Sequence, residues 1–434
     1  MQIPPPAAQI LKTLHAAGYT AFLTGGCVRD MLLARQPKDW DVATNARPDE
    51  LTKLFVGAEL IGAHFGVSLW HGVEIATFRS DGPYPDGRHP QTVTFETDPA
   101  KDAARRDFTI NALFYDTQTQ TVIDHVNGQA DLNNKLIRAV GNPEARFAED
   151  HLRLLRAVRF AARFEFEIEP QTRAAICNQS RLINNVAAER TRDELTKILT
   201  EPHPRRGFEL LDQLNLLEQI LPEIKAMQGV EQPKEFHPEG DVWTHTLLML
   251  ESLNQPTETL AWAVLLHDVA KPKTYQKTDR IRFNGHAELG AKMAGQILHR
   301  LRYPTAVIET VRDLVAQHMK FMEVRRMKES TKKRFLRQPF FPELLELHRQ
   351  DCQSSHGKMD NHDFCKAELE RLPPEVLRPN RLLTGDDLIQ MGIPEGPQIG
   401  QLLRQIEDAQ LEGTITNEAQ ARALIEAKTI PQPE

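Results

Sequence analysis

Cysteine is scarce in this sequence, with four residues in 434, and none has the spacing of a zinc knuckle. The four, Cys27, Cys177, Cys352 and Cys365, are expected to be free thiols in a reducing cytoplasm. Long apolar runs are also missing, because no stretch reaches the roughly 18 residues that span a bilayer. The N-terminus has no charged segment followed by an apolar one, so no signal peptide is predicted. We therefore expect a cytoplasmic protein without membrane contact.

A surplus of positive charge is absent too, since the formal net charge is −7. This balance does not suggest a nucleic-acid binder, but it does not exclude one, because basic residues can gather on one face. The composition, 40% hydrophobic and 26% charged, is ordinary for a globular protein, and the length allows two or more domains. The sequence contains no internal repeat.

The first third of the chain mixes two periodicities. Helices are expected at 9–18 and 48–55, the second because Pro follows Arg47 as a start signal. Alternating and β-branched residues predict strands at 67–70, 73–78 and 92–96. The segment 80–90 is rich in Gly, Pro and Asp and is expected to be a mobile loop. From about residue 146 onward the pattern is almost entirely helical, which predicts an α+β protein with a mixed α/β head and a helical remainder.

Residues 22–44 predict a strand, a Gly-Gly turn, a short helix and a second strand. Gly25 and Gly26 have no side chains, so their backbone N–H groups can approach an anion, and Arg29 can point at the same anion. Asp39 and Asp41 are two apart on the expected strand, so both carboxylates project from one face. Two close carboxylates predict a site for two metal ions. Either feature alone is more often a plain turn; together they are specific.

This stretch resembles the head of the class II nucleotidyltransferases, which comprise the bacterial CCA-adding tRNA nucleotidyltransferases and the bacterial poly(A) polymerases. The resemblance implies that Gly-Gly-Cys-Val-Arg-Asp holds a triphosphate and that Asp-Trp-Asp binds Mg²⁺. Glu74, on a following strand, is a weaker candidate for a third acid. The run 84–90 is similar to the family's flexible loop, which weakly favours an enzyme able to add adenosine.

A second cluster lies at 105–113, Arg-Arg-Asp-Phe-Thr-Ile-Asn-Ala-Leu. Taken alone, Asp107 could cap a helix and the two arginines could be solvated. The run resembles the family's motif for ribose and triphosphate contacts, which implies those roles for Arg106 and Asp107. A carboxylate at Asp107 can accept a hydrogen bond from a 2′-hydroxyl.

A third cluster begins at Glu149 and follows a helical spacing. Arg153, Arg156, Arg159 and Arg163 form one stripe with Asp150 beside them, and an apolar face lies opposite. An isolated helix of this kind would most often be a solvated basic face. The cluster resembles the family's Glu-Asp-x-x-Arg motif, which implies that Asp150 and Arg153 read the incoming base and that Arg156 and Arg159 hold phosphates. A carboxylate and a guanidinium match the donor and acceptor that C and A share, and reject U and G. The run 188–199 resembles the next motif, in which Glu189 and Arg190 would brace this helix.

Histidines and aspartates recur at long intervals farther on. A single helical histidine is more often a packed core residue than a ligand. Here the set resembles an HD-type phosphohydrolase domain, which implies metal ligands at His245, His267, Asp268 and Asp351. His286 and His318 would be further ligands or phosphate contacts, and His237 lies nearby in the sequence.

Together these features predict four parts: a catalytic head at 1–142, a neck with the base-reading helix at 143–200, a body with the HD-type metal domain at 201–355, and a helical tail at 356–434 that packs or contacts RNA. The function expected is template-independent addition or repair of the 3′-terminal CCA of tRNA from CTP and ATP, with Mg²⁺ in the head and a second divalent metal in the HD-type domain. The oligomeric state stays open.

Three rivals remain. A poly(A) polymerase or an enzyme adding only A would use the same catalytic residues, although no long basic C-terminal extension is present. A phosphohydrolase whose head only binds RNA, or an RNA-binding regulator without turnover, is disfavoured by the intact Asp39 and Asp41.

Overall fold

The computed structural model describes residues 3–62 and 65–429, and their contacts divide the chain into two compact units. The first comprises Met1–Ala226 with two short segments, Leu253–Pro256 and Arg300–Tyr303; the second comprises the remainder. Mixed α/β structure is confined to the first part of the chain and helices dominate after it, which confirms the predicted fold class. None of the described helices combines the length and apolarity that a bilayer crossing requires.

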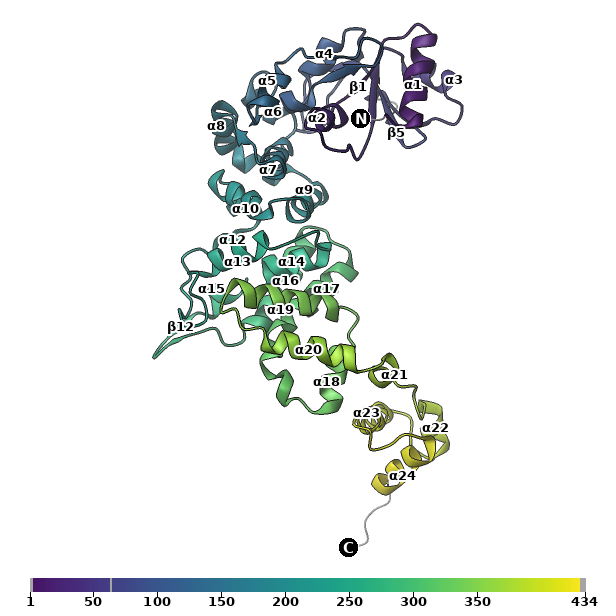
Figure 1. Ribbon diagram of the computed structural model, residues 1–434, viewed down its shortest axis with the longest axis vertical. Helices are drawn as coiled ribbons and strands as arrows, with labels where there is room; N and C mark the ends of the chain where they lie inside the picture. The colour runs from purple at the N-terminus through teal and green to yellow at the C-terminus, as the bar shows by residue number, and fades with distance from the viewer. Residues whose placement is uncertain (1–2, 63–64, 430–434) are drawn as a thin grey trace. The chain divides into compact units, whose positions relative to one another are not determined.

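A seven-stranded sheet organises the first unit (Figure 1). Its order is β3-β4-β5-β2-β1-β8-β9, and every neighbouring pair is antiparallel except β2 with β5. The strands are β1 (Ala21–Thr24), β2 (Asp41–Thr44), β3 (Glu59–Gly62), β4 (Val67–Trp70), β5 (Val73–Thr77), β8 (Phe114–Asp116) and β9 (Thr121–Ile123). Two small pairs accompany it: β6 (Arg79–Asp81) with β7 (Val93–Phe95), and β10 (Leu136–Ile137) with β11 (Glu167–Ile168).

The first helices of the first unit alternate with the strands of this sheet, and the later ones form a helical segment that follows it in the chain. They are α1 (Pro5–Ala16), α2 (Gly26–Leu32), α3 (Pro48–Leu54), α4 (Pro99–Ala104), η2 (Thr109–Asn111), α5 (Gly128–Asn133), α6 (Pro143–Glu149), α7 (Arg153–Phe164), α8 (Pro170–Gln179), η3 (Ser180–Asn185), α9 (Ala188–Thr200), α10 (Pro204–Gln213), α11 (Leu217–Ile220) and α12 (Pro222–Lys225). The predicted elements at 9–18, 48–55, 67–70 and 73–78 are present with small shifts at their ends.

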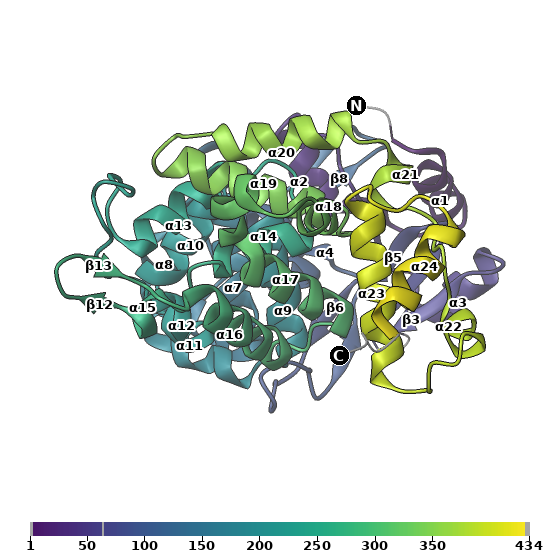
Figure 2. The same cartoon turned by 90° about the horizontal axis from the view of Figure 1, so that it is seen from below.

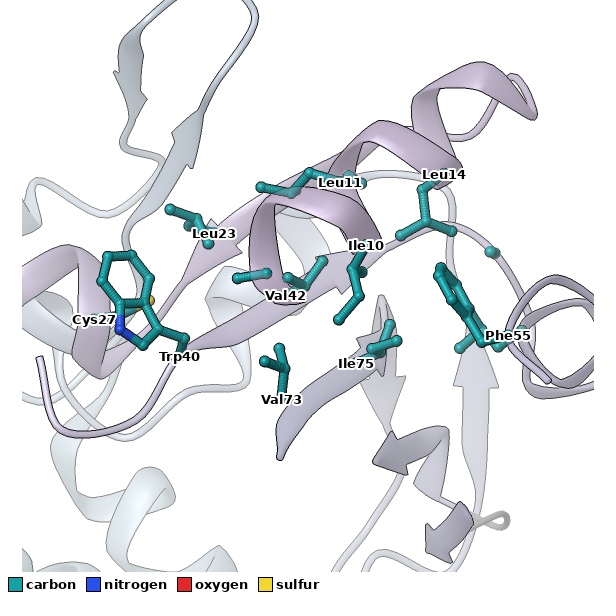
Figure 3. Packing of buried hydrophobic residues seen from close by; sticks show 14 of the residues in the cluster. Ile10, Leu11, Leu14, Leu23, Cys27, Trp40, Val42, Phe55, Val73 and Ile75 are labelled. Atoms are coloured by element: carbon teal, nitrogen blue, oxygen red, sulfur yellow. The ribbon is translucent and has the colours of Figure 1, made fainter. Parts of the chain in front are cut away.

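The head core forms because α1 turns an apolar stripe toward the sheet. Ile10 and Leu14 of that helix are fully buried: Ile10 points toward Val42 and Ile75 of the sheet's central strands, and Leu14 points toward Phe55 (Figure 3). Burying such side chains contributes about 1.5–3 kcal/mol each. The strands that carry the predicted carboxylates are therefore fixed by the core beneath them.

As far as residue 429, the last one described, the second unit is helical apart from one short hairpin, β12 (Gln276–Lys277) with β13 (Ile281–Arg282). Its helices are α13 (Val242–Glu251), α14 (Glu258–Leu266), α15 (Lys271–Thr274), α16 (His286–Arg300), α17 (Thr305–Gln317), η4 (His318–Arg326), α18 (Glu329–Leu336), α19 (Phe341–Ser354), α20 (Asp360–Arg371), α21 (Pro374–Leu377), α22 (Gly385–Gln390), α23 (Pro397–Leu411) and α24 (Glu418–Thr429). The last three, yellow in Figure 2, enclose their own core around Leu388 and Ile406.

Candidate active site

The Gly-Gly turn needs glycine at its first position for two reasons. Gly25 has φ +71°, and a Cβ there would lie 3.1 Å from Nη1 of Arg106. The expectation that both glycine N–H groups face an anion is wrong for Gly25, because its N–H donates to the carbonyl of Leu113 at 3.1 Å. Gly26 begins α2, where the first N–H groups have no partner within the helix. Gly25 thus supplies space beside Arg106, and Gly26 is the remaining backbone donor.

Only one of the two predicted carboxylates lies on the strand. β2 begins at Asp41, whereas Asp39 lies in a bend before it, so the expected strand placement of Asp39 is wrong. Trp40 between them is buried and anchors the bend. Asp41 is in register with Glu74 on the parallel strand β5, which brings the weaker candidate beside it.

Negative charge is concentrated at this point of the sheet. Burial, then the charge of Glu74, and more weakly that of Asp39, raise the pKa of Asp41 to about 6, although Arg106 opposes the shift. Carboxylates held this close repel one another unless a cation lies among them. The three acids are suited to a divalent metal ion.

All eleven residues that the sequence predicts for the head site line one cleft of about 620 Å³. They are Gly25, Gly26, Arg29, Asp39, Asp41, Arg106, Asp107, Asp150, Arg153, Arg156 and Arg159. Glu74 lines it too, as do Arg79 and Asn111, which the sequence did not single out. Arg79 carried no motif signal, whereas Asn111 lay within the second cluster.

The base-reading pair is held by a network that the sequence only partly indicated. α7 begins at Arg153, and Asp150 precedes it in extended backbone after α6, so the two are not on one helix as predicted. Both carboxylate oxygens of Asp150 accept from Arg190 of α9, at 3.0 and 2.9 Å. Nη1 of Arg153 donates to Glu149 at 2.6 Å, and its Nη2 donates to the carbonyl of Arg105 at 3.2 Å. The bracing expected of Arg190 therefore consists of two direct hydrogen bonds to Asp150.

The basic stripe of α7 is not a solvated face. Arg156 donates twice to one oxygen of Asp107, at 2.8 and 2.6 Å, and Arg159 lies 3.0 Å from Glu194, with both members of the latter pair buried. Burial alone would raise the pKa of Asp107, but the charge and hydrogen bonds of Arg156 lower it to about 2. Asp107 and Arg156, predicted to contact ribose and phosphate separately, are therefore paired with each other.

Arg29 lines the cleft and is already bonded to side chains of the protein. It is 4% exposed, and its guanidinium donates to Asp30 at 2.8 Å and to Asn111 at 2.6 Å. Its Cζ lies 4.6 Å from the ring centroid of Phe164 and 5.3 Å from that of Phe160, both on α7. Its buried contacts thus join α2 to α7 at the wall of the cleft.

The glycine-rich loop is shorter than predicted, because Ser80 and Asp81 belong to β6. The hydroxyl of Tyr84 donates to Asp81 at 2.7 Å. A Cβ at Gly87 would lie 2.4 Å from the ring of His151, and the backbone N–H of His151 donates to the Gly87 carbonyl at 3.3 Å. The loop therefore contacts the segment that precedes α7.

The predicted histidine and aspartate ligands form a cluster that lies wholly within the second unit. His245 comes from α13, His267 and Asp268 follow α14, and Asp351 comes from α19. His286 and His318 stand at the starts of α16 and η4. Two trios of these residues have ligand atoms within 4.8 Å of one another: His245, His267 and Asp351, and Asp268, His286 and His318. A third trio, His237, Glu239 and His245, shares His245 with the first.

Backbone carbonyls set the tautomer of three of these histidines. Nδ1 of His267, His286 and His318 lies 2.9, 2.8 and 2.7 Å from a carbonyl three residues earlier. A carbonyl only accepts, so Nδ1 carries the proton and Nε2 presents a lone pair. Nε2 of His286 and His318 are 3.2 Å apart, a contact that brings two acceptors together unless a cation or proton separates them.

Burial and charge keep this cluster ready to bind a cation. Burial, followed by the proximity of the titratable rings of His267 and His286, lowers the pKa of His318 to about 3, so that its ring is neutral. Although burial would raise the pKa of Asp268, His267 and Lys271 hold it well below its usual value. Nε2 of His267 and both oxygens of Asp268 are buried without a hydrogen bond in suitable geometry.

Three neighbours of this cluster were missed from sequence. Oε1 of Glu239 lies 2.8 Å from Nδ1 of His245 and 2.9 Å from that of His237. Lys271 lies 2.6 Å from Asp268 and donates to Gln232 at 2.6 Å. The spacing of Lys271, three residues after Asp268, was a usable signal, whereas Gln232 and Glu239 had none.

Three family profiles match successive parts of the chain. The Poly A polymerase head domain matches residues 21–138, the "Probable RNA and SrmB- binding site of polymerase A" matches 165–228, and the HD domain matches 240–347. The first contains the Gly-Gly turn and the carboxylates, and the third contains His245, His267 and Asp268.

Whole-length similarity extends across nearly all of the chain. A CCA-adding enzyme of Lactobacillus johnsonii is 31% identical over 440 residues, covering 95% of this chain and 94% of that protein. A CCA-adding enzyme of Levilactobacillus brevis is 34% identical over 422 residues, covering 96% and 95%. The crystal structure of the Bacillus stearothermophilus CCA-adding enzyme in complex with CTP superimposes with a TM-score of 0.74 at 25% identity, covering 98% of both chains. The chain therefore belongs to the family of CCA-adding enzymes.

Proposed function

We propose that this protein is a template-independent RNA nucleotidyltransferase that adds or repairs the 3′-terminal CCA of tRNA from CTP and ATP. The observation that carries the proposal is the convergence of all eleven predicted head residues on one cleft. The names of the relatives and the CTP complex of the Bacillus stearothermophilus protein support it.

Nucleotidyl transfer in this family uses divalent metal ions, and we propose Mg²⁺ at Asp39 and Asp41, with Glu74 beside them. Oxygen ligands suit Mg²⁺, and burial, followed by the charge of Glu74, raises the pKa of Asp41. The chemistry such ions supply is activation of the primer 3′-hydroxyl and neutralisation of the departing pyrophosphate.

Base selection is assigned to Asp150 and Arg153. The carboxylate would accept from the exocyclic amino group of C or A, and the guanidinium would donate to the adjacent ring nitrogen. Arg190 holds Asp150 by both oxygens, and Glu149 holds Arg153, so the pair is oriented before a nucleotide arrives. Such preorganisation favours discrimination, since neither group can turn to accommodate U or G.

Triphosphate binding is assigned to Gly26 and the arginines of the cleft wall, Arg29, Arg106, Arg156 and Arg159. In the structure each guanidinium is paired with a carboxylate of the protein. Those bonds fix the guanidinium planes and leave other N–H groups for phosphate oxygens. Asp107 is assigned to the ribose through the orientation that Arg156 gives it.

The four-part division into head, neck, body and tail is also part of this proposal, as is action in the cytoplasm. The four free cysteines agree with a reducing compartment. A poly(A) polymerase or an A-only enzyme would use the same cleft and is the first alternative.

The test is incubation of the full-length protein with tRNA lacking its CCA end and with each labelled nucleotide separately, then with CTP and ATP together. We expect two cytidines and then one adenosine to be added, and no addition to a tRNA that already ends in CCA. Long adenosine tracts would support the poly(A) alternative, and labelling only of tRNA ending in CC would support the A-only enzyme.

A second activity is proposed for the second unit, a metal-dependent phosphohydrolase. The lone pairs at Nε2 of His267, His286 and His318 and the buried carboxylate of Asp268 fit a divalent ion. His245, His267, Asp268 and Asp351 would hold it, and the chemistry it supplies is activation of a bound water toward a phosphoester. Release of phosphate from nucleotide esters by metal-loaded protein, absent after chelation, tests this activity.

A further inference from the structure

One buried carboxylate lies behind the arginines of the cleft and touches none of the metal-binding acids. Asp102, on α4, is 1% exposed. Its Oδ1 accepts from Nε and Nη2 of Arg105 at 2.9 and 2.7 Å, and its Oδ2 accepts from Nε and Nη2 of Arg106 at 3.2 and 2.9 Å. Each arginine is therefore held through the same two nitrogens, which fixes the plane of its guanidinium.

The arginine held by Oδ2 reaches the Gly-Gly turn. Nη1 of Arg106 donates to the carbonyl of Asn111 at 3.0 Å and lies 3.1 Å from the position that a Cβ on Gly25 would occupy. Because Nε and Nη2 face Asp102, the opposite side of the guanidinium faces the turn and the cleft that it lines. A phosphate above the turn would meet this side.

The arginine held by Oδ1 connects to the rest of the cleft. The carbonyl of Arg105 accepts from Arg153 at 3.2 Å, and its guanidinium lies 3.7 Å from Asp81. Asp81 in turn accepts from Tyr84 of the glycine-rich loop. Asp102 is thus bonded directly to Arg106, and it is connected through Arg105 to the base-reading Arg153 and to the glycine-rich loop.

We propose that Asp102 is a positioning residue for the triphosphate: it holds Arg105 and Arg106 so that their remaining N–H groups face the β- and γ-phosphates. This inference rests on the proposed nucleotidyl-transfer function. It predicts that loss of the negative charge at Asp102 weakens binding of the triphosphate much more than binding of the matching monophosphate.

The test compares Asp102→Asn with wild type in the full-length protein, measuring the dissociation constants of CTP and CMP with Mg²⁺ and the melting temperature. Asn keeps the shape but can accept at only one of its two terminal atoms. The matched control is Asp131→Asn. Asp131 is also a buried head aspartate, 5% exposed, and it accepts from Arg138 at 3.1 and 3.0 Å, but Arg138 does not line the cleft, whereas Arg105 and Arg106 do.

We expect Asp102→Asn to lower the preference for CTP over CMP about tenfold or more, and Asp131→Asn to lower the melting temperature while leaving that preference unchanged. An unchanged preference in folded Asp102→Asn overturns the inference. If Asp102→Asn does not fold, Asp102→Glu is measured: a shifted preference supports the inference and a wild-type preference overturns it. Failure of the wild type to bind CTP at all would instead refute the proposed function.

Discussion

The head cleft and the histidine cluster differ in how their buried charged and polar groups are paired. In the cleft, the arginines of α7 face acids of other elements, Glu149, Asp107 and Glu194 among them. In the cluster of the second unit, histidine lone pairs and carboxylate oxygens are buried together, and Nε2 of His267 and Oδ1 of Asp268 have no hydrogen bond in suitable geometry. The side chains of the cleft are therefore ordered before an anionic substrate binds, whereas the ligand set of the cluster needs a cation to balance its buried acceptors.

This contrast implies that the two sites respond differently to the loss of a side chain. Removing a residue from the cleft's network releases a neighbour that was paired. Removing a ligand from the cluster relieves crowding among acceptors, at the cost of cation binding.

Asp41→Ala should abolish nucleotide addition while tRNA still binds. Loss of a metal ligand should lower the rate on the order of a thousandfold or more, equivalent to about 4 kcal/mol of transition-state stabilisation. Incorporation of CTP into tRNA lacking CCA, together with a tRNA binding assay, measures both. Asp116→Ala, at the end of β8 and outside the cleft, is the control and should behave as wild type. Near-normal incorporation by Asp41→Ala would refute its role as a metal ligand.

The double variant His267→Ala with Asp268→Ala should lose bound divalent metal and any metal-dependent phosphohydrolase activity, while nucleotide addition survives. Metal content after dialysis, phosphate release and CCA addition are the measurements. His348→Ala is the matched control, because His348 is a buried histidine of the same unit that stacks on Phe321 at 4.0 Å, outside the two trios. Loss of CCA addition in the folded double variant would contradict the independence of the two sites.

Variants of the base-reading pair should change which nucleotide is used. Arg153→Ala should weaken use of both CTP and ATP by about 1–3 kcal/mol, because one acceptor of the base is left unpaired. Asp150→Ala should relax rejection of UTP and GTP, and Arg190→Ala should do so to a smaller degree by freeing Asp150. The control is Arg192→Ala, on the same helix, which bonds Asp193 instead. A uniform fall in rate without altered selectivity would mean that the pair only binds phosphate.

Acid should remove the stabilisation that Arg156 gives to Asp107. The folded pKa of about 2 lies below the unfolded value of about 3.9, so the contribution is complete above about pH 5 and is lost as the pH falls toward 2. The expected contribution is about 2–3 kcal/mol. Denaturant unfolding of wild type and Asp107→Asn between pH 6 and pH 2 measures it, and the gap between their unfolding free energies should narrow over that fall. If the difference in unfolding free energy stays constant with pH, ionised Asp107 does not stabilise the folded protein.

Sequence patterns predicted the elements and the membership of the cleft more accurately than the contacts within it. Helical and alternating periodicities are local, so the fold class and the family resemblance, both confirmed, followed from short runs such as 22–44 and 105–113. The partners of the arginines are not local: Arg156 meets Asp107 49 positions away, and Asp150 meets Arg190 40 positions away. No spacing rule reveals such pairs, which is why α7 could be mistaken for a solvated face.

Strand and helix ends were the other weakness. Asp39 and Asp150 were placed on a strand and a helix that begin two and three residues later, at Asp41 and Arg153. Element boundaries depend on hydrogen bonds with distant partners, here β1 and β5 for Asp41, and a single run of residues does not encode them.

The burial of Arg29 against Phe160 and Phe164 also bears on how the protein is made. The Gly-Gly turn leaves the ribosome early, but its arginine gains its aromatic neighbours only after α7 has been synthesised, and Asp150 gains Arg190 later still. Contacts this distant along the chain make closure of the cleft a late event in folding. A nascent chain that pauses before α9 would present a formed sheet with an unfinished nucleotide pocket, so translation itself delays the first turnover.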